Sequence, residues 1–154
     1  MASDRPSWDE YFMTITREVA GRSTCERAKV GAVMVRERSI LATGYNGAPA
    51  GMPHCLDAGC LVYESRTPDG GLEENCFRTI HAEINAIAQA ARNGMRIDGS
   101  DIYVTHTPCI HCFKVIVNTG IRRVFYERPY KMETIEELRR ASSIELVQVG
   151  GTSG

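Results

Sequence analysis

The second half of the chain alternates apolar, strand-like runs with short amphipathic helices, and this alternation constrains the fold more than any other feature. The strand-like runs cover residues 101–106, 122–126 and 144–149. Between them, helical patterns cover 109–119 and 133–141. Strands that are separated by short helices commonly run parallel, so the pattern predicts an α/β domain whose sheet has a parallel portion packed by helices.

The first part of the chain adds a helix and a hairpin to this sheet. Ser7 and Glu10 form a capping-box pattern, and apolar residues then recur at helical spacing as far as Ala20, which predicts an amphipathic helix. Apolar runs at 30–35 and 39–45 are joined by a short charged turn and predict a β-hairpin.

The segment 46–79 differs from its surroundings because it is rich in Gly, Pro and Cys. We expect it to form a long insertion loop, with 63–75 as an acidic, solvent-facing excursion. A structureless loop of this length is unusual in a compact domain, so some further interaction must hold it. A single domain is expected over 1–149, and a flexible tail over 150–154.

The net charge and the aromatic content limit the classes of molecule that the chain is expected to bind. The 154 residues carry a formal net charge of −1, and only 7% are aromatic. Binding of nucleic acid needs many basic groups and stacking aromatic rings, so no nucleic-acid partner is expected. The chain has no apolar run of roughly 18 residues for a membrane span, and its first residues do not resemble a secretory signal. We therefore expect a cytoplasmic protein, whose six cysteines are metal ligands or free thiols rather than disulfides.

Two short motifs carry the chemistry. His81 stands two residues before Glu83 at the beginning of a predicted helix, and Pro108 precedes Cys109 and Cys112 at the beginning of another. Two thiolates three residues apart and one imidazole make three ligands for a catalytic zinc ion, which leaves a fourth position open for water. Glu83 is then free to transfer protons.

A lone Cys-x-x-Cys is also typical of a structural zinc knuckle, and a lone His-x-Glu has little meaning. The two motifs in this order, each opening a helix, favour the catalytic interpretation, because H-x-E followed by P-C-x-x-C is the signature of zinc-dependent deaminases.

The sequence around these motifs resembles the deoxycytidylate (dCMP) deaminases, and especially the bacterial, late-competence ComEB-like branch of the cytidine deaminase superfamily. The resemblance is carried by HAEINAI at 81–87, YVTHTPC at 103–109 and TGYNG at 43–47, and it extends over about 8–130. It implies a cytidine-deaminase-like fold, a three-layer α/β/α arrangement with a central five-stranded mixed sheet.

The resemblance also implies an activity, which is the hydrolysis of dCMP to dUMP and ammonia and which supplies dUMP for thymidylate synthesis. Members of the family are commonly homo-oligomers, often hexamers, and many bind an allosteric nucleotide, here expected with Mg²⁺. The substrate is a small-molecule nucleotide.

Three residues match substrate contacts of the family. Arg27 matches an arginine that contacts the phosphate, although alone it is typical of a solvated surface charge. Asn46 matches an asparagine of the substrate pocket, and its neighbours Gly44 and Gly47 allow a sugar or phosphate to approach closely; an ordinary turn is the alternative. Tyr126 resembles a tyrosine near the nucleotide, and it is alternatively a half-buried strand residue.

The remaining cysteines are Cys25, Cys55, Cys60 and Cys76. Four thiolates are a typical ligand set for a structural zinc ion, and such an ion would pin the long loop. Family members with a second zinc held by Cys and His make His54 a rival ligand. Four unrelated thiols are the alternative.

Two other functions remain open. One is deamination of another cytosine or adenine substrate. A tRNA or single-stranded nucleic acid is disfavoured by the near-neutral charge and the low aromatic content, and a free nucleoside would leave Arg27 and Asn46 without a role. The other is a catalytically inactive, zinc-stabilised regulatory protein, which the presence of Glu83 disfavours because a structural zinc site needs no such carboxylate.

Overall fold

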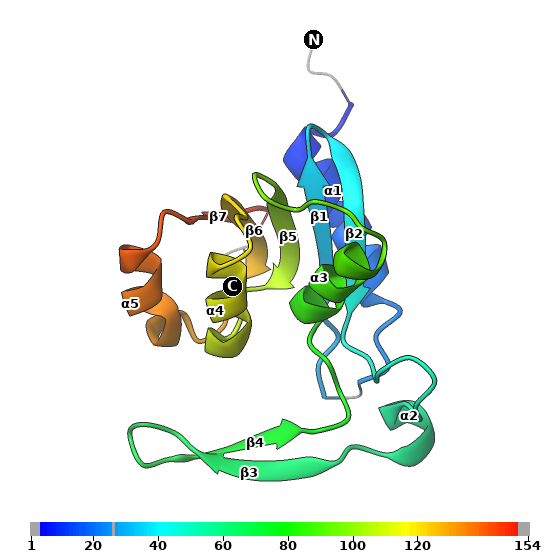
Figure 1. Cartoon of the computed structure of the whole chain (residues 1–154), viewed down its shortest axis with the longest axis vertical. Coiled ribbons are helices and arrows are strands. Elements are labelled where there is room, and N and C mark those ends of the chain that lie inside the picture. Colours follow the sequence, from blue (N-terminus) through cyan, green and yellow to red (C-terminus); the bar gives the residue numbers. More distant parts are fainter. Residues whose placement is uncertain (1–3, 26, 151–154) are drawn as a thin grey trace.

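A five-stranded mixed sheet forms the centre of the protein, as the computed structural model shows for residues 4–25 and 27–150 (Figure 1). Its strands, in chain order, are β1 (Gly31–Arg36), β2 (Ser39–Tyr45), β5 (Asp101–His106), β6 (Arg123–Arg128) and β7 (Glu145–Gln148). The helices are α1 (Trp8–Ala20), α2 (Cys55–Ala58), α3 (Ala82–Arg92), α4 (Ile110–Val117) and α5 (Met132–Ala141). The tail expected over 150–154 lies outside the described residues except for its first position.

The order of the strands is β2-β1-β5-β6-β7. β1 pairs antiparallel with β2 and with β5, whereas β5, β6 and β7 are parallel to one another. The mixed sheet and its parallel portion are therefore confirmed. The β1–β2 connection is a two-residue turn in which Glu37 and Arg38 both have positive φ, at 51° and 64°, and this geometry matches the natural twist of a hairpin.

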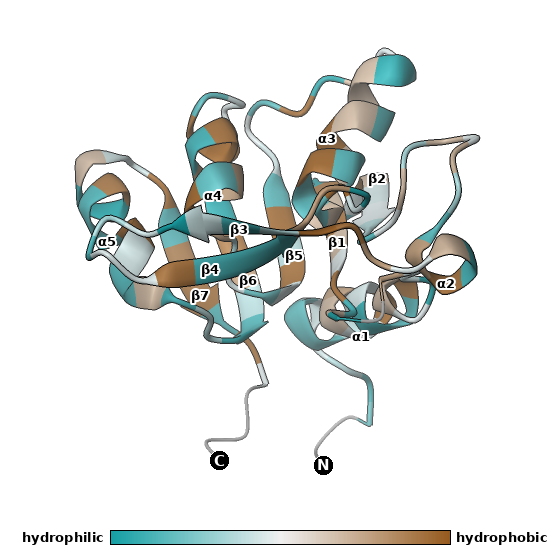
Figure 2. Cartoon of the chain, turned by 90° about the horizontal axis from the view of Figure 1, so that it is seen from below, coloured by the Kyte–Doolittle hydropathy of each residue, from teal (hydrophilic) through white to brown (hydrophobic). Residues whose placement is uncertain are grey.

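Two apolar clusters, one on each face of the sheet, make up the core. Because side chains alternate along a strand, Val33, Tyr103 and Phe125 pack against α1 on one face. Their neighbours Ile102 and Val124 belong to the cluster on the other face, which includes residues of α3, α4 and α5. Figure 2 shows α1 on one side of the sheet and α3 and α4 on the other, so the three-layer arrangement is confirmed.

The segment 46–79 is not the structureless loop that we expected from the sequence. It contains α2 and a separate two-stranded antiparallel hairpin of β3 (Val62–Arg66) and β4 (Leu72–Cys76). In Figure 1 this hairpin runs across the molecule below the carboxyl end of β5. The hairpin was not predicted because its residues are mostly exposed or half-buried and several are acidic. Acidic residues are depleted in strands.

No helix among the described residues has both the length and the apolar character needed to cross a lipid bilayer.

Candidate active site

The three residues predicted to bind a catalytic zinc ion meet at the ends of two helices. His81 is the N-cap of α3, Cys109 is the N-cap of α4, and Cys112 lies in the first turn of α4. The Nδ1 atom of His81 is 3.3 Å from the Sγ atom of Cys112 and 3.5 Å from that of Cys109. Ligands around a tetrahedral zinc ion are separated by about 3.5–3.8 Å, so these three residues fit such an ion.

The electrostatics of the site favour the thiolate form of Cys109, which is the form that binds a metal ion. Hydrogen bonds with Cys112 and His81 lower the pKa of the Cys109 thiol to about 4, although partial burial opposes this change. The hydrogen bond between the two cysteines raises the pKa of the Cys112 thiol. The hydrogen bond between Cys109 and His81 raises the pKa of His81. The positive ends of the helix dipoles further favour negative charge at this position.

Glu83 lies beside these ligands with only 4% of its surface exposed. Burial raises the pKa of its carboxyl group, whereas the hydrogen bond from Cys112 acts in the opposite direction. A raised pKa makes the carboxylate a better acceptor of a proton. The placement of Glu83 therefore suits proton transfer within the cavity that it lines.

The zinc-ligand group opens into a cavity of about 520 Å³. This volume falls within the usual range for small-molecule sites, roughly 300–1,000 Å³. Its walls come from the segment before β1, the end of β2, the hairpin strand β4, the beginnings of α3 and α4, the end of β5, and the loop after β6. The lining residues that bear on function are Arg27, Asn46, Glu74, His81, Glu83 and Tyr130.

Asn46 lines the cavity, but most of its hydrogen-bonding capacity serves the protein. Its Oδ1 atom accepts a hydrogen bond from the backbone N–H of Ala82 at 2.8 Å, and its Nδ2 atom donates one to the carbonyl oxygen of Ala28 at 3.2 Å. Asn46 thus joins the end of β2 to the first turn of α3, where His81 and Glu83 stand. One Nδ2 hydrogen stays available for a ligand.

The glycines next to Asn46 have a different role from the one that we expected. A Cβ atom at Gly44 would lie 2.2 Å from the carbonyl oxygen of Ala82 and 2.5 Å from the backbone nitrogen of Ala86. At Gly47 it would lie 3.1 Å from the ring of Tyr45. Gly44 therefore allows α3 to pack directly on β2. Its neighbours are protein atoms, so the expectation that it makes room for a sugar or phosphate is corrected.

Of the other two predicted substrate contacts, Arg27 and Tyr126, the structure places only Arg27 in the wall of the cavity. Arg27 lines the cavity and forms an ion pair with Glu74 of β4 at 3.5 Å. Tyr126 does not line the cavity; it packs against the core cluster that includes residues of α4 and α5. Inward and outward positions alternate along β6 and this one faces the helices, which fits the alternative of a half-buried strand residue and gives the expected substrate contact no support from the cavity. Tyr130, in the loop after β6, lines the cavity instead.

Sequence reasoning missed Tyr130 and the hairpin residues Glu74 and Asn75 of the cavity wall. Tyr130 belongs to no motif, although its position shortly after a strand that enters the site was a usable signal. Glu74 and Asn75 could not be found because the hairpin itself was not predicted.

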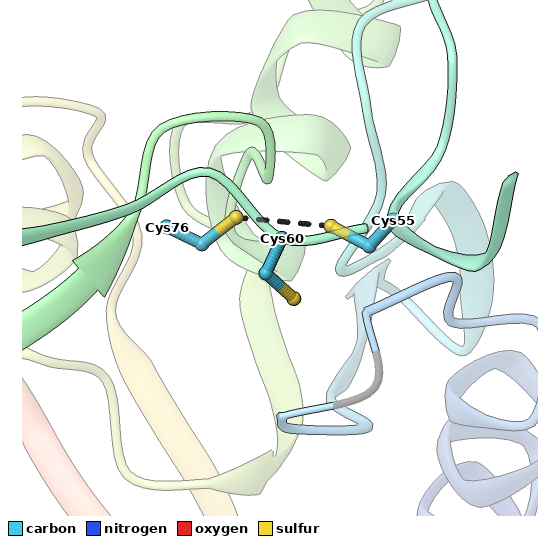
Figure 3. A group of neighbouring side chains, drawn as sticks. All are labelled: Cys55, Cys60 and Cys76. Atoms are coloured by element: carbon cyan, nitrogen blue, oxygen red, sulfur yellow. Dashed lines mark hydrogen bonds between the residues drawn. The ribbon is translucent and has the colours of Figure 1, made fainter. Parts of the chain in front are cut away.

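A second group of thiols is formed by Cys55, Cys60 and Cys76, whose Sγ atoms all lie within 4.8 Å of one another (Figure 3). The Sγ atoms of Cys55 and Cys76 are 3.7 Å apart, close to the separation across a tetrahedral zinc ion. The pKa of Cys60 is raised to about 11 by partial burial, by Cys55 and by the nearby thiols of Cys76 and Cys25.

Cys25 and His54 stay outside this group of three. Cys25 is buried next to it and lines the cavity. His54 is the N-cap of α2, and its Nδ1 atom is hydrogen-bonded to the Oγ1 atom of Thr24 at 3.0 Å. The structure thus assembles three of the predicted ligands of a second metal ion and leaves Cys25 and His54 as candidates for the fourth.

Comparison with known proteins adds an independent line of information. The sequence model of the cytidine and deoxycytidylate deaminase zinc-binding region matches residues 6–128. The ComE operon protein 2 of Bacillus subtilis is 44% identical over 147 residues, which are 95% of this chain and 73% of that protein. The deoxycytidylate deaminase of Schizosaccharomyces pombe is 37% identical over 145 residues, 94% of this chain but only 44% of that protein.

Among solved structures, the dCMP deaminase of the cyanophage S-TIM5 in complex with dCMP and dUMP superposes with a TM-score of 0.75. It is 30% identical, and the match covers 96% of this chain and 100% of the phage protein.

Proposed function

The chain belongs to the family of cytidine and deoxycytidylate deaminases, and from this premise we propose that it is a zinc-dependent enzyme that hydrolyses dCMP to dUMP and ammonia. The observation that carries the proposal is that His81, Cys109 and Cys112 meet as a group of metal ligands beside a cavity that is lined by His81, Cys109 and Glu83. The product dUMP would supply thymidylate synthesis.

His81, Cys109 and Cys112 would hold the catalytic zinc ion, because their ligand atoms are spaced as a tetrahedral ion requires. When bound, zinc supplies a Lewis acid that lowers the pKa of water toward neutrality.

Glu83 carries the protons of the reaction. Its carboxylate takes a proton from the attacking water and delivers it to the N3 atom of the cytosine ring. A further proton transfer allows the amino group to leave as ammonia. Burial of Glu83 supports this role, because it raises the pKa of the carboxyl group and so makes its carboxylate a better acceptor for the proton of the attacking water.

Arg27 and Asn46 would orient the nucleotide. Arg27 presents a guanidinium group to the cavity, and guanidinium binds phosphate with two parallel hydrogen bonds. Asn46 keeps one Nδ2 hydrogen for the substrate while its other contacts hold α3 in place.

A second, structural zinc ion bound by Cys55, Cys60 and Cys76 is also part of the proposal. The spacing of the three thiols supports it. Cys25 is the preferred fourth ligand because it lies next to the group, and His54 is the rival. A metal assay should give two zinc ions per chain, and a single zinc ion with these cysteines open to alkylation would contradict the second site.

The remaining parts of the proposal have two sources. The single domain over 1–149 and the cytoplasmic location follow from the sequence, whereas assembly into a homo-oligomer such as a hexamer and control by an allosteric nucleotide with Mg²⁺ follow from the family. Light scattering tests the assembly, and dCMP saturation curves with and without dCTP and Mg²⁺ test the control.

The decisive experiment is a substrate panel. Loss of cytosine absorbance is followed on dCMP, CMP, deoxycytidine and a cytosine-bearing oligonucleotide. We expect dCMP to have the highest kcat/KM. A preference for the oligonucleotide or the free nucleoside would overturn the assignment of a mononucleotide substrate.

A further inference from the structure

The end of the cavity that is proposed to receive the phosphate carries very little positive charge. Among the described residues that line the cavity, Arg27 is the only arginine or lysine. One guanidinium group matches one phosphoryl group through two hydrogen bonds. A second and a third phosphate would need further cations, and the cavity wall offers none at this point.

A carboxylate stands where such a cation would be needed. Glu74 of β4 lines the cavity and pairs with Arg27 at 3.5 Å, and the two side chains are 56% and 42% exposed. An exposed pair of this kind is weak, so a phosphate can displace Glu74 from Arg27. The carboxylate nevertheless stays at the mouth of the cavity, next to the bound phosphate.

The hairpin holds Glu74 in that place. Glu73, one residue earlier, forms an ion pair with Lys131 in the loop after β6. Cys76, two residues later, belongs to the group of three thiols. These two contacts, one on each side of Glu74, keep this part of β4 at the mouth of the cavity. Glu64 lies directly opposite on β3 and adds negative charge to the same face of the hairpin.

From this geometry we propose that Glu74 makes the site selective for nucleoside monophosphates over di- and triphosphates. The inference rests on the proposed function, since it presumes a nucleotide whose phosphate meets Arg27. A single phosphate gains Arg27 as its partner. The β- and γ-phosphates of a longer chain meet the carboxylate of Glu74, and such like-charge contacts exclude wrong ligands from binding sites.

The test compares kcat/KM for dCMP, dCTP and deoxycytidine in the zinc-loaded wild-type protein and in Glu74→Gln. We expect the ratio of kcat/KM for dCMP to that for dCTP to fall by about tenfold in Glu74→Gln, the effect of removing one exposed like-charge contact. The value for deoxycytidine, which has no phosphate, should stay within about twofold of that of the wild type.

Glu64→Gln is the matched control, because it removes the same charge from the same face of the hairpin at a residue that does not line the cavity. It should change the ratio by less than about threefold, as expected for a more distant and screened charge. Glu74→Asp keeps the charge and should keep most of the selectivity.

Two results overturn the inference alone. One is an unchanged ratio in Glu74→Gln, and the other is a parallel loss of activity on all three substrates, which would mean that Glu74 only holds the hairpin or Arg27 in place. A wild-type protein that prefers deoxycytidine to dCMP contradicts the proposed function, and it removes the phosphate on which the inference depends.

Discussion

Glu83 combines near-complete burial with a place beside three metal-ligand atoms, so its substitution is the sharpest test at the scale of a single residue. In Glu83→Gln the amide keeps the size of the side chain but cannot transfer protons. We expect kcat to fall by about 10² to 10⁴. Zinc content and thermal midpoint, measured on the same sample, should match those of the wild type. Turnover within tenfold of the wild type would contradict the proton-transfer role.

Gly44 shows how packing alone can decide the identity of a residue next to the site. In Gly44→Ala the new Cβ atom would meet the backbone of α3 at 2.2 Å. Backbone atoms cannot move aside as a side chain can, so α3 must shift. We expect a loss of about 1–3 kcal/mol in the free energy of unfolding, measured by urea denaturation, together with weaker zinc binding because α3 carries His81.

Gly47→Ala, in the same motif, is the matched control for Gly44→Ala. Its Cβ atom would meet the side chain of Tyr45 at 3.1 Å, which can yield. The loss of stability should be less than half of that of Gly44→Ala. Equal losses in the two variants would mean that the contact between α3 and β2 is not what requires a glycine at position 44.

At the scale of elements, the β3–β4 hairpin is the part of the described chain with the least support from the core. Pairing with the central sheet does not hold it; it depends on the thiol group and on ion pairs such as that between Glu73 and Lys131. In Cys60→Ser we expect one zinc ion per chain instead of two. Amide hydrogen exchange in the hairpin should accelerate by about tenfold or more, because local opening then costs less free energy.

Exchange in the central strand β5 serves as the internal reference for Cys60→Ser and should not change. Unchanged exchange in the hairpin, with two zinc ions still bound, would show that Cys60 is not a ligand. Acceleration throughout the sheet would instead show that the substitution weakens the whole fold.

The helices and strands around the site show which of its residues could be predicted from the sequence. His81, Glu83, Cys109 and Cys112 fall within short motifs at helix beginnings, where spacing along the chain determines which side chains share a face. The strands and helices around them also followed from local periodicity. Cavity residues such as Tyr130 are brought to the site by tertiary contacts that no local pattern records.

The hairpin illustrates the same limit for an entire element. Residues Val62 to Cys76 contain acidic groups and two half-exposed faces, so they lack the apolar alternation that marks a strand packed on a core. Gly44 was assigned to the substrate for a related reason. The helix that passes over it comes from a part of the sequence about 40 residues later, and its position is set by packing in three dimensions.

At the scale of the whole molecule, the catalytic zinc ion would join two helices that also share one apolar cluster. His81 begins α3, and Cys109 and Cys112 begin α4, while both helices pack on the same face of the sheet. A ligand that binds only the folded protein stabilises it by about 4 kcal/mol at 1,000 times its dissociation constant. For a chain of this size, removal of zinc should therefore lower the thermal midpoint by roughly 10 °C.

The Cys60→Ser variant isolates this effect, because only the catalytic ion remains to be removed from it. A chelator should lower the thermal midpoint of Cys60→Ser by roughly 10 °C. In the double variant Cys60→Ser/Cys112→Ser the chelator should have almost no effect, since the thiolate that completes the ligand set is lost. If the double variant responds to the chelator as strongly as the single one, zinc stabilises the fold from another position, and α3 and α4 are held together by their apolar contacts alone.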